Sequence, residues 1–294
     1  MVENNPDWLK KSYPWKSNFI AVSGGQYHYL DEGEKSAPVL LAVHGNPTWS
    51  FYWRTLVSAF SNKFRVVIPD HIGCGFSDKP QDWPYRLSDH IDNLCTLVEQ
   101  LDLKNIHLIV HDWGGAIGMG MAGRLTNRIS KLIVTNTASF RSKEIPLSIA
   151  SCRIPVFGSI AVRGFNAFAG VATWRASAVG LETDVKRALL FPYNSWKNRI
   201  ATLRFVEDIP LKEGHPSYST LCDVEKGLEK LIQFPMIIFW GNDDFCFSPS
   251  FRKEWEKRFP DALVHDWDDV GHYVMEDASQ RVISTLEDWF SKDN

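Results

Sequence analysis

The chain has 294 residues, of which 44% are hydrophobic and 23% charged, values ordinary for a globular protein. Its formal net charge is -3, and both signs are spread along the chain without a basic block, which excludes nucleic acid as the expected partner. No stretch approaches about 18 consecutive apolar residues and the polar start lacks a signal-peptide core, so we expect neither a membrane span nor secretion.

The first half of the chain alternates strand and helix signals. Residues 19–22 and 26–30 alternate apolar and polar around Gly24 and Gly25, which predicts a β-hairpin. The elements that follow are predicted in this order: a strand at 39–43, a helix at 51–60, a strand at 64–68, a helix capped by Ser88, a strand at 106–110, a helix, and a strand at 131–135.

The strand signal then stops between about residues 138 and 210, where the chain is rich in Phe, Ala, Trp and Arg. This stretch is too long for a loop and too apolar for a linker, so it predicts a helical cap over the carboxyl edge of the sheet. Later elements are a strand at 236–240, a helix at 249–259, a strand at 262–266 and a final amphipathic helix.

Strands that alternate with helices indicate an α/β fold with a mostly parallel central sheet flanked by helices. We expect a core domain formed by residues 1–138 and 211–294, with a cap domain at 139–210 inserted between two strands. Five scattered cysteines without CxxC spacing are typical of reduced thiols, which favours a cytoplasmic protein.

The turn at 111–115, His-Asp-Trp-Gly-Gly, joins the strand at 106–110 to a helix. A strand that breaks on a glycine pair into a helix is typical of a nucleophile elbow, which lifts one side chain clear of the sheet. That side chain is Asp112, a carboxylate that can attack carbon without first losing a proton. The same turn also fits an aspartate that only caps the helix.

In this frame the nucleophile is followed along the chain by an acid and then by a histidine. Residues 136–138 follow the next strand but contain no carboxylate, whereas Asp243 and Asp244 follow the strand after the cap. We predict Asp244 as the acid, with Asp243 as the second choice; the alternative is that both only cap the turn. His272 follows the last strand and is the predicted base.

The chain resembles the haloalkane dehalogenases of the α/β-hydrolase superfamily in five motifs: HGNPTWS at 44–50, PDHIGCGFSDKP at 69–80, HDWGG at 111–115, WGNDD at 240–244 and GHYVMED at 271–277. The resemblance runs from about Phe19 over nearly the whole chain and is weakest in the cap. An acid after the post-cap strand is similar to the subgroup that shares its sequence around PDHIGCG with the β-lactone decarboxylases of long-chain olefin biosynthesis.

The resemblance implies an α/β-hydrolase fold with Asp112, Asp244 and His272 as the catalytic triad. The indole N–H of Trp113 and the amide N–H of Asn46 can hold a leaving halide, and the backbone N–H groups of the same two residues can form an oxyanion hole. Trp113 can alternatively serve only to pack against the cap.

These residues predict a haloalkane dehalogenase, a hydrolase that acts on carbon–halide bonds without a metal or an organic cofactor. Asp112 displaces halide from an sp3 carbon of a small apolar substrate, and His272 activates the water that hydrolyses the resulting ester. The products are an alcohol, a proton and chloride or bromide. The alternative is a long-chain β-lactone, converted to an alkene and carbon dioxide by the same triad.

Two other functions are less favoured. Epoxide hydrolysis requires tyrosines in the cap that protonate the epoxide, and only Tyr193 is available there. A non-catalytic ligand receptor is disfavoured because the triad is intact, and a homo-oligomer remains compatible with the sequence. Large aromatic residues of the cap either line an access route or form its core: Phe140, Phe165, Phe168, Trp174, Phe191 and Trp196.

Overall fold

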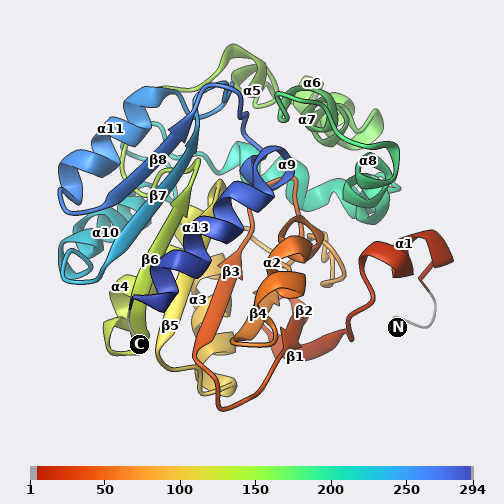
Figure 1. Ribbon diagram of the computed structural model, residues 1–294. Coiled ribbons are helices and arrows are strands. Elements are labelled where there is room, and N and C mark those ends of the chain that lie inside the picture. The colour runs from red at the N-terminus through yellow and green to blue at the C-terminus, as the bar shows by residue number, and fades with distance from the viewer. Residues whose placement is uncertain (1–4, 293–294) are drawn as a thin grey trace.

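The computed structural model describes residues 5–292, which form one sheet covered by helices on both faces (Figure 1). In the described chain the sheet has eight strands in the order β1-β2-β4-β3-β5-β6-β7-β8. Strand β2 pairs antiparallel with β1 and β4, and all later neighbours pair in parallel. The strands are β1 (Asn18–Val22), β2 (Gly25–Glu32), β3 (Val39–Val43), β4 (Arg65–Pro69), β5 (Ile106–His111), β6 (Ile129–Thr135), β7 (Met236–Gly241) and β8 (Leu263–Trp267).

Each predicted strand is present with its ends within two residues of the predicted bounds. Strands β3 and β5 are buried at every position, as their continuous apolar sequences predict for strands covered on both faces. The hairpin is also confirmed, because Val22 pairs with Gly25 across the turn. The prediction of an α/β fold with a mostly parallel sheet is therefore correct.

Two helical layers cover the sheet. Helices α3 (Leu87–Gln100), α4 (Trp113–Arg124), α10 (Tyr218–Gly227) and α11 (Pro249–Arg258) share one apolar core with one face of the sheet. Helices α2 (Arg54–Phe60), α12 (Val274–Asp277) and α13 (Ser279–Ser291) share the core on the other face. The remaining elements outside the cap are α1 (Asp7–Ser12), η2 (Ser50–Trp53), η3 (Thr126–Arg128) and η7 (Leu228–Lys230).

The prediction that Ser88 caps its helix is wrong by two residues. Helix α3 begins at Leu87, so Ser88 lies inside its first turn and Arg86 is the N-cap. The carboxylate of Asp89 accepts the backbone N–H of Arg86 at 2.9 Å. Asp208 accepts the N–H of Leu87, also at 2.9 Å. These carboxylates satisfy the end of the helix without the hydroxyl of Ser88.

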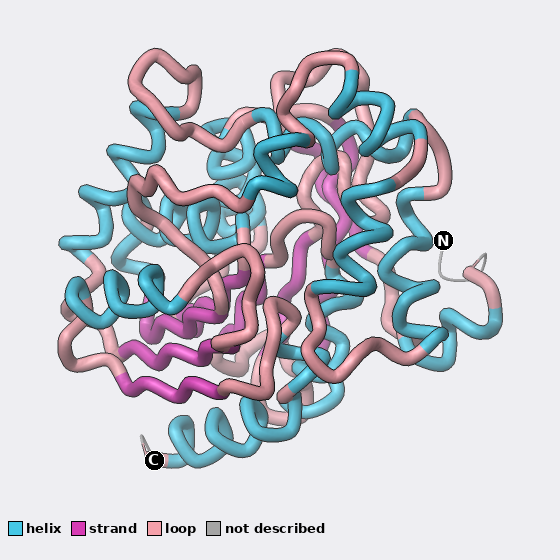
Figure 2. The backbone as a smooth tube through the Cα atoms, turned by 90° about the horizontal axis from the view of Figure 1, so that it is seen from above, coloured by secondary structure: helices cyan, strands magenta, loops and turns pink. Residues whose placement is uncertain are grey.

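The segment between β6 and β7 forms a series of helices above the carboxyl edge of the sheet, and we call residues 139–210 the cap segment (Figures 1 and 2). Hydrogen bonds to Trp49, Thr48 and Asn46 tie it to the loop after β3. Its elements are α5 (Leu147–Ser151), α6 (Phe157–Ser159), η4 (Ile160–Gly164), α7 (Ala167–Arg175), α8 (Thr183–Leu190), η5 (Phe191–Tyr193), η6 (Lys197–Arg199) and α9 (Ile200–Glu207).

A buried contact between Asp70 and His28 fixes the loop after β4. The Oδ2 of Asp70 lies 2.7 Å from Nδ1 of His28, and both side chains are fully buried. Asp70 also accepts the backbone N–H groups of Ser50 at 2.6 Å and Phe76 at 2.9 Å. Burial alone raises the pKa of Asp70, but the charge of His28 and these hydrogen bonds outweigh it and hold the pKa far below 3.8.

We expect Asp70→Asn to lower the free energy of unfolding by about 1.5–3 kcal/mol, because it removes a buried charged acceptor of the backbone N–H groups of Ser50 and Phe76. Urea denaturation measures this change. The exposed pair of Asp92 with Arg124 supplies the control, since Asp92→Asn should cost less than about 1 kcal/mol.

The same carboxylate predicts a pH dependence. Since the pKa of folded Asp70 is depressed, its contribution is present above the unfolded pKa and is lost as the pH falls below 3.8. Asp70→Asn should therefore show a smaller loss of stability than the wild type on acidification. An equal loss in both proteins would contradict this role of Asp70.

Candidate active site

Asp112 occupies the turn between β5 and α4 with a left-handed backbone, φ 50° and ψ -127°. This conformation is unusual for a residue other than glycine and is typical of a nucleophile elbow. The side chain makes no capping hydrogen bond to α4. Asp112 is therefore the N-cap residue of α4 by position, but without a side-chain capping bond.

Two glycines make room for this turn. A Cβ atom at Gly45 would collide with the carboxylate of Asp112, and one at Gly115 would collide with the hydroxyl of Thr137. That hydroxyl donates a hydrogen bond to the backbone carbonyl of Asp112. Gly45 and Gly115 thus give the strained turn its space, and Thr137 supports its backbone.

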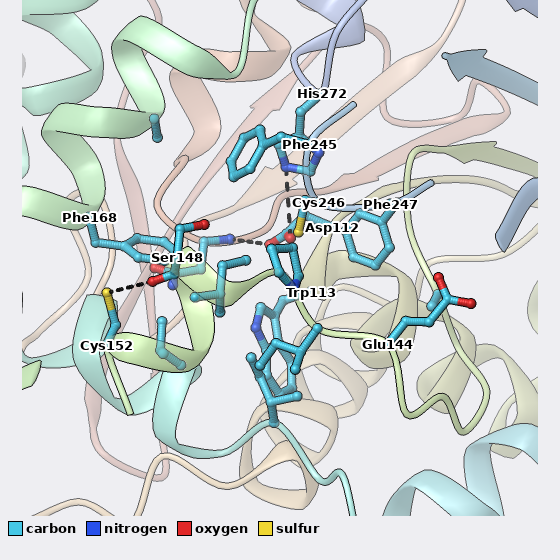
Figure 3. Close-up of a pocket in the computed structure, with 18 of the residues that line it drawn as sticks. Asp112, Trp113, Glu144, Ser148, Cys152, Phe168, Phe245, Cys246, Phe247 and His272 are labelled. Atoms are coloured by element: carbon cyan, nitrogen blue, oxygen red, sulfur yellow. Dashed lines mark hydrogen bonds and ion pairs between the residues drawn. The ribbon is translucent and has the colours of Figure 1, made fainter. Parts of the chain in front are cut away.

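The two carboxylate oxygens of Asp112 have different neighbours. Oδ1 accepts the backbone N–H of Asn46 at 2.6 Å, whereas Oδ2 lies 3.8 Å from Nε2 of His272 (Figure 3). Burial raises the pKa of Asp112, and the charge of His272 and the backbone N–H groups of Asn46 and Trp113 oppose this effect. Oδ2 lies beyond hydrogen-bond distance from His272, so the lone pairs of Oδ2 are available for attack on a ligand.

His272 connects Asp112 to the predicted acid. Its Nδ1 lies 2.8 Å from Oδ2 of Asp244, and Oδ1 of Asp244 accepts the backbone N–H of Cys246 at 2.6 Å. Burial by itself lowers the pKa of His272, but the charges of Asp244 and Asp112 outweigh it and hold the pKa above 6.5. Asp243 instead lies half-exposed, 3.7 Å from Arg175. The structure therefore brings Asp244, and not Asp243, to His272.

Sequence reasoning overlooked Asn136, which follows β6. Its Nδ2 donates to Oδ2 of Asp244 at 2.7 Å and to the carbonyl of Gly241 at 2.9 Å, while its Oδ1 accepts the N–H of Gly241 at 2.8 Å. Asn136 thus orients the same oxygen that contacts His272. The available signal was an amide at the first of the two usual acid positions, residues 136–138, which lack a carboxylate.

His111 holds the backbone of His272 from behind. Its Nε2 lies 2.9 Å from the carbonyl of His272, and its ring stacks on Tyr52. Burial lowers the pKa of His111 well below 6.5, so this imidazole is neutral. Its Nε2–H can donate a hydrogen bond to that carbonyl.

The two predicted halide donors both line the cavity beside Asp112. The Nδ2 of Asn46 donates to the carbonyl of Thr202 at 3.2 Å, which leaves its second N–H for a ligand. The ring of Trp113 packs against Phe205 of α9, with centroids 5.2 Å apart. Trp113 thus lines the cavity and also packs against the cap segment.

The cavity has a volume of about 400 Å³ and reaches from Asp112 to the cap segment. Phe245 and Phe247 flank the ring of His272 at 6.0 and 5.8 Å (Figure 3). Of the six cap aromatics singled out in the sequence, two line the cavity, Phe140 and Phe168. The other four lie elsewhere, so the expected access route is lined mainly by smaller apolar residues.

Within residues 5–292, two features are absent: a metal-binding cluster of side chains and a helix that could span a membrane. No group of three or more His, Cys, Asp and Glu side chains is arranged to hold a metal ion. None of the helices in this range is both long and apolar enough to cross a membrane.

Comparisons with known proteins identify relatives of this fold. The family model described as alpha/beta hydrolase fold matches residues 38–279. The chain is 44% identical over 290 residues to a cis-3-alkyl-4-alkyloxetan-2-one decarboxylase of Shewanella oneidensis, covering 95% of this chain and 89% of that protein. A protein of the same name in Xanthomonas campestris is 39% identical, with 88% and 90% covered. The crystal structure of a haloalkane dehalogenase from Bradyrhizobium elkani superposes with a TM-score of 0.86 at 25% identity, with 94% and 98% covered.

We expect Asn136→Ala to raise the pKa of His272 further, because Asp244 loses a donor that competes with the imidazole for Oδ2. An NMR titration of the His272 ring measures the shift. Asn242→Ala is the matched control, since this amide contacts only Asp266 and Asp268. An unchanged or lowered pKa in Asn136→Ala would contradict the positioning role.

Proposed function

The chain belongs to the α/β hydrolase fold family, and we propose that it is a β-lactone decarboxylase. Its relatives include both haloalkane dehalogenases and oxetanone decarboxylases. Its substrate is a cis-3,4-dialkyl oxetan-2-one, which it converts to an alkene and carbon dioxide. The motifs alone favoured haloalkane hydrolysis, with this reaction as the alternative. The identities of 44% and 39% to proteins named for the lactone reaction support the reverse order.

The arrangement of the Asp112 carboxylate is the observation that carries the proposal. Oδ1 is held by the backbone N–H of Asn46, whereas Oδ2 faces an apolar cavity beside His272. A buried carboxylate that is only partly solvated by the protein is a stronger nucleophile than one in water. It is placed to attack an sp3 carbon of a ligand in this cavity.

The lactone reaction follows in two balanced steps. Oδ2 of Asp112 attacks ring carbon C4, the C4–O bond breaks, and the ring oxygen leaves as part of a free carboxylate on C3. The bond from C3 to this carboxylate then breaks and carbon dioxide departs. The released electron pair forms the C3=C4 bond, and the C4–Oδ2 bond breaks to restore Asp112. No water is consumed.

The neighbouring groups suit the negative charge of this intermediate. The raised pKa of His272 favours its cationic form, and Nε2 lies 3.8 Å from the attacking oxygen. The side chains of Asn46 and Trp113 can donate hydrogen bonds to the carboxylate released from the ring. Asp244 stabilises the cation of His272 through its 2.8 Å contact with Nδ1.

Haloalkane hydrolysis is the second candidate, because Asn46 and Trp113 form the pair of donors that a leaving halide requires. In this reaction His272 acts as a base for water, which attacks the carboxyl carbon of the Asp112 ester. The negative charge then develops on Oδ1, where the backbone N–H of Asn46 already donates. Epoxide hydrolysis has no such support, since Tyr193 is buried and donates to the carbonyl of Thr48.

The two candidates differ in the fate of Asp112 in water enriched in oxygen-18. We expect the wild type to release alkene from a long-chain cis-β-lactone, measured by gas chromatography, and the Asp112 peptide to stay unlabelled because only the alkyl–oxygen bond breaks. Short bromoalkanes are assayed in parallel for halide release.

The controls for this assay use two aspartates. Asp112→Ala should abolish alkene release, whereas Asp243→Asn should retain it because Asp243 lies away from His272. Halide release without alkene, accompanied by heavy oxygen in Asp112, would establish haloalkane hydrolysis instead.

His272→Phe separates the water step from the attack. With a bromoalkane, the variant should accumulate the alkyl ester on Asp112, seen as the added alkyl mass on that peptide, because no base activates water. With the lactone it should still turn over, more slowly, because that reaction needs no water. His265→Phe, on β8, is the control and should behave as the wild type. Full bromoalkane hydrolysis by His272→Phe would refute the assigned base.

A further inference from the structure

Exposed apolar side chains gather on the cap segment. Of the twelve large hydrophobic residues that are exposed in the described chain, ten lie between residues 147 and 196. The most exposed are Leu147 at 88%, Phe165 at 79%, Trp174 at 76% and Val156 at 71%. A concentration of exposed apolar side chains on one segment is typical of a site of association with another surface. We call these four residues, with Phe157 and Val171, the cap apolar surface.

The charge of this region is opposite to that of the rest of the chain. Residues 145–181 contain three arginines and neither Asp nor Glu. The whole cap segment has ten Lys and Arg against five Asp and Glu, whereas the complete chain has a net charge of -3. The exposed apolar residues are therefore set in a positively charged part of an otherwise acidic protein.

The cap apolar surface is continuous with the cavity above Asp112. Phe157 and Val171 are 56% and 48% exposed, and both also line the cavity. Helices α5, α6 and α7, which carry most of this surface, lie together along one side of the molecule (Figure 1). The cavity thus reaches the exposed apolar side chains of the cap segment, with Glu144 as a charged residue of its lining.

We propose that the cap apolar surface docks the protein onto an anionic phospholipid membrane. Aromatic and aliphatic side chains enter the interface between headgroups and acyl chains, and the arginines attract the anionic headgroups. The docked cavity then opens toward the acyl chains, so an apolar ligand can enter from the bilayer without crossing water. Exposure, charge and continuity with the cavity carry this inference, which does not depend on the reaction proposed above.

The charge of the surface favours a membrane over a second copy of the chain. A symmetric dimer through this face would bring two positively charged cap segments together, which is unfavourable. Arg163, whose guanidinium lies 4.7 Å from the ring of the exposed Trp196, keeps an aromatic side chain beside a positive charge at the surface. Such pairs suit the boundary between anionic headgroups and acyl chains.

Co-sedimentation with vesicles tests the proposal. Vesicles of phosphatidylcholine with about 30 mol % phosphatidylglycerol should bind the wild type at least about tenfold more tightly than pure phosphatidylcholine. Added salt should weaken this binding, because screening removes the attraction of the arginines. The double variant Phe165→Asp/Trp174→Asp should lose about tenfold or more in affinity for the anionic vesicles.

The matched control is Ile232→Asp/Leu263→Asp. It changes two exposed apolar residues outside the cap segment, 51% and 47% exposed, and adds the same charge. This variant should bind the anionic vesicles as the wild type does. Circular dichroism and thermal unfolding verify that both double variants are folded.

Two results would overturn the proposal. One is that the wild type does not bind anionic vesicles, or that Phe165→Asp/Trp174→Asp binds them equally well. The other is that the wild type is a dimer without affinity for vesicles, and that the same double variant dissociates it into monomers, measured by sedimentation equilibrium. That result would assign the surface to a second copy of the chain.

Discussion

The convergence of parallel strands at one edge of the sheet is the constraint on which the site depends. Asn46, Asp112, Asn136 and Asp244 follow β3, β5, β6 and β7, and His272 follows β8. Because neighbouring parallel strands end at the same edge, residues up to 161 positions apart meet within hydrogen-bond distance there. The hydrogen bond from the Asn46 backbone to Asp112 joins two of these strand ends and fixes the direction of the carboxylate.

Burial alone does not determine the charges at this edge. His111 and His272 are both fully enclosed, yet the pKa of His111 is lowered and that of His272 is raised. The difference is that His272 lies between the carboxylates of Asp244 and Asp112, whereas His111 meets a carbonyl and an aromatic ring. The pKa values of two buried histidines are thus shifted in opposite directions, because the nearby carboxylates favour the cation of His272 and burial disfavours that of His111.

The cap segment contributes to the molecule in two ways. On its inner side Phe205 packs against Trp113, and Phe168 lines the cavity. The carbonyl of Thr202 accepts a hydrogen bond from the side chain of Asn46. On its outer side most of the exposed large apolar residues of the described chain are found. A single layer of helices cannot bury both of its sides against one sheet edge, so the outer side remains available for another surface.

The α/β fold, the strand positions and the elbow at Asp112 could be predicted from the amino-acid sequence, because apolar runs and glycine pairs act locally. It could not choose firmly between Asp243 and Asp244, since that choice depends on which carboxylate faces His272 after the chain folds. Asn136 was overlooked for the same reason: its role exists only where β6 and β7 lie side by side. These contacts, and the surface that the cap segment leaves exposed, could be seen only after folding. Both depend on how residues far apart in the chain pack together.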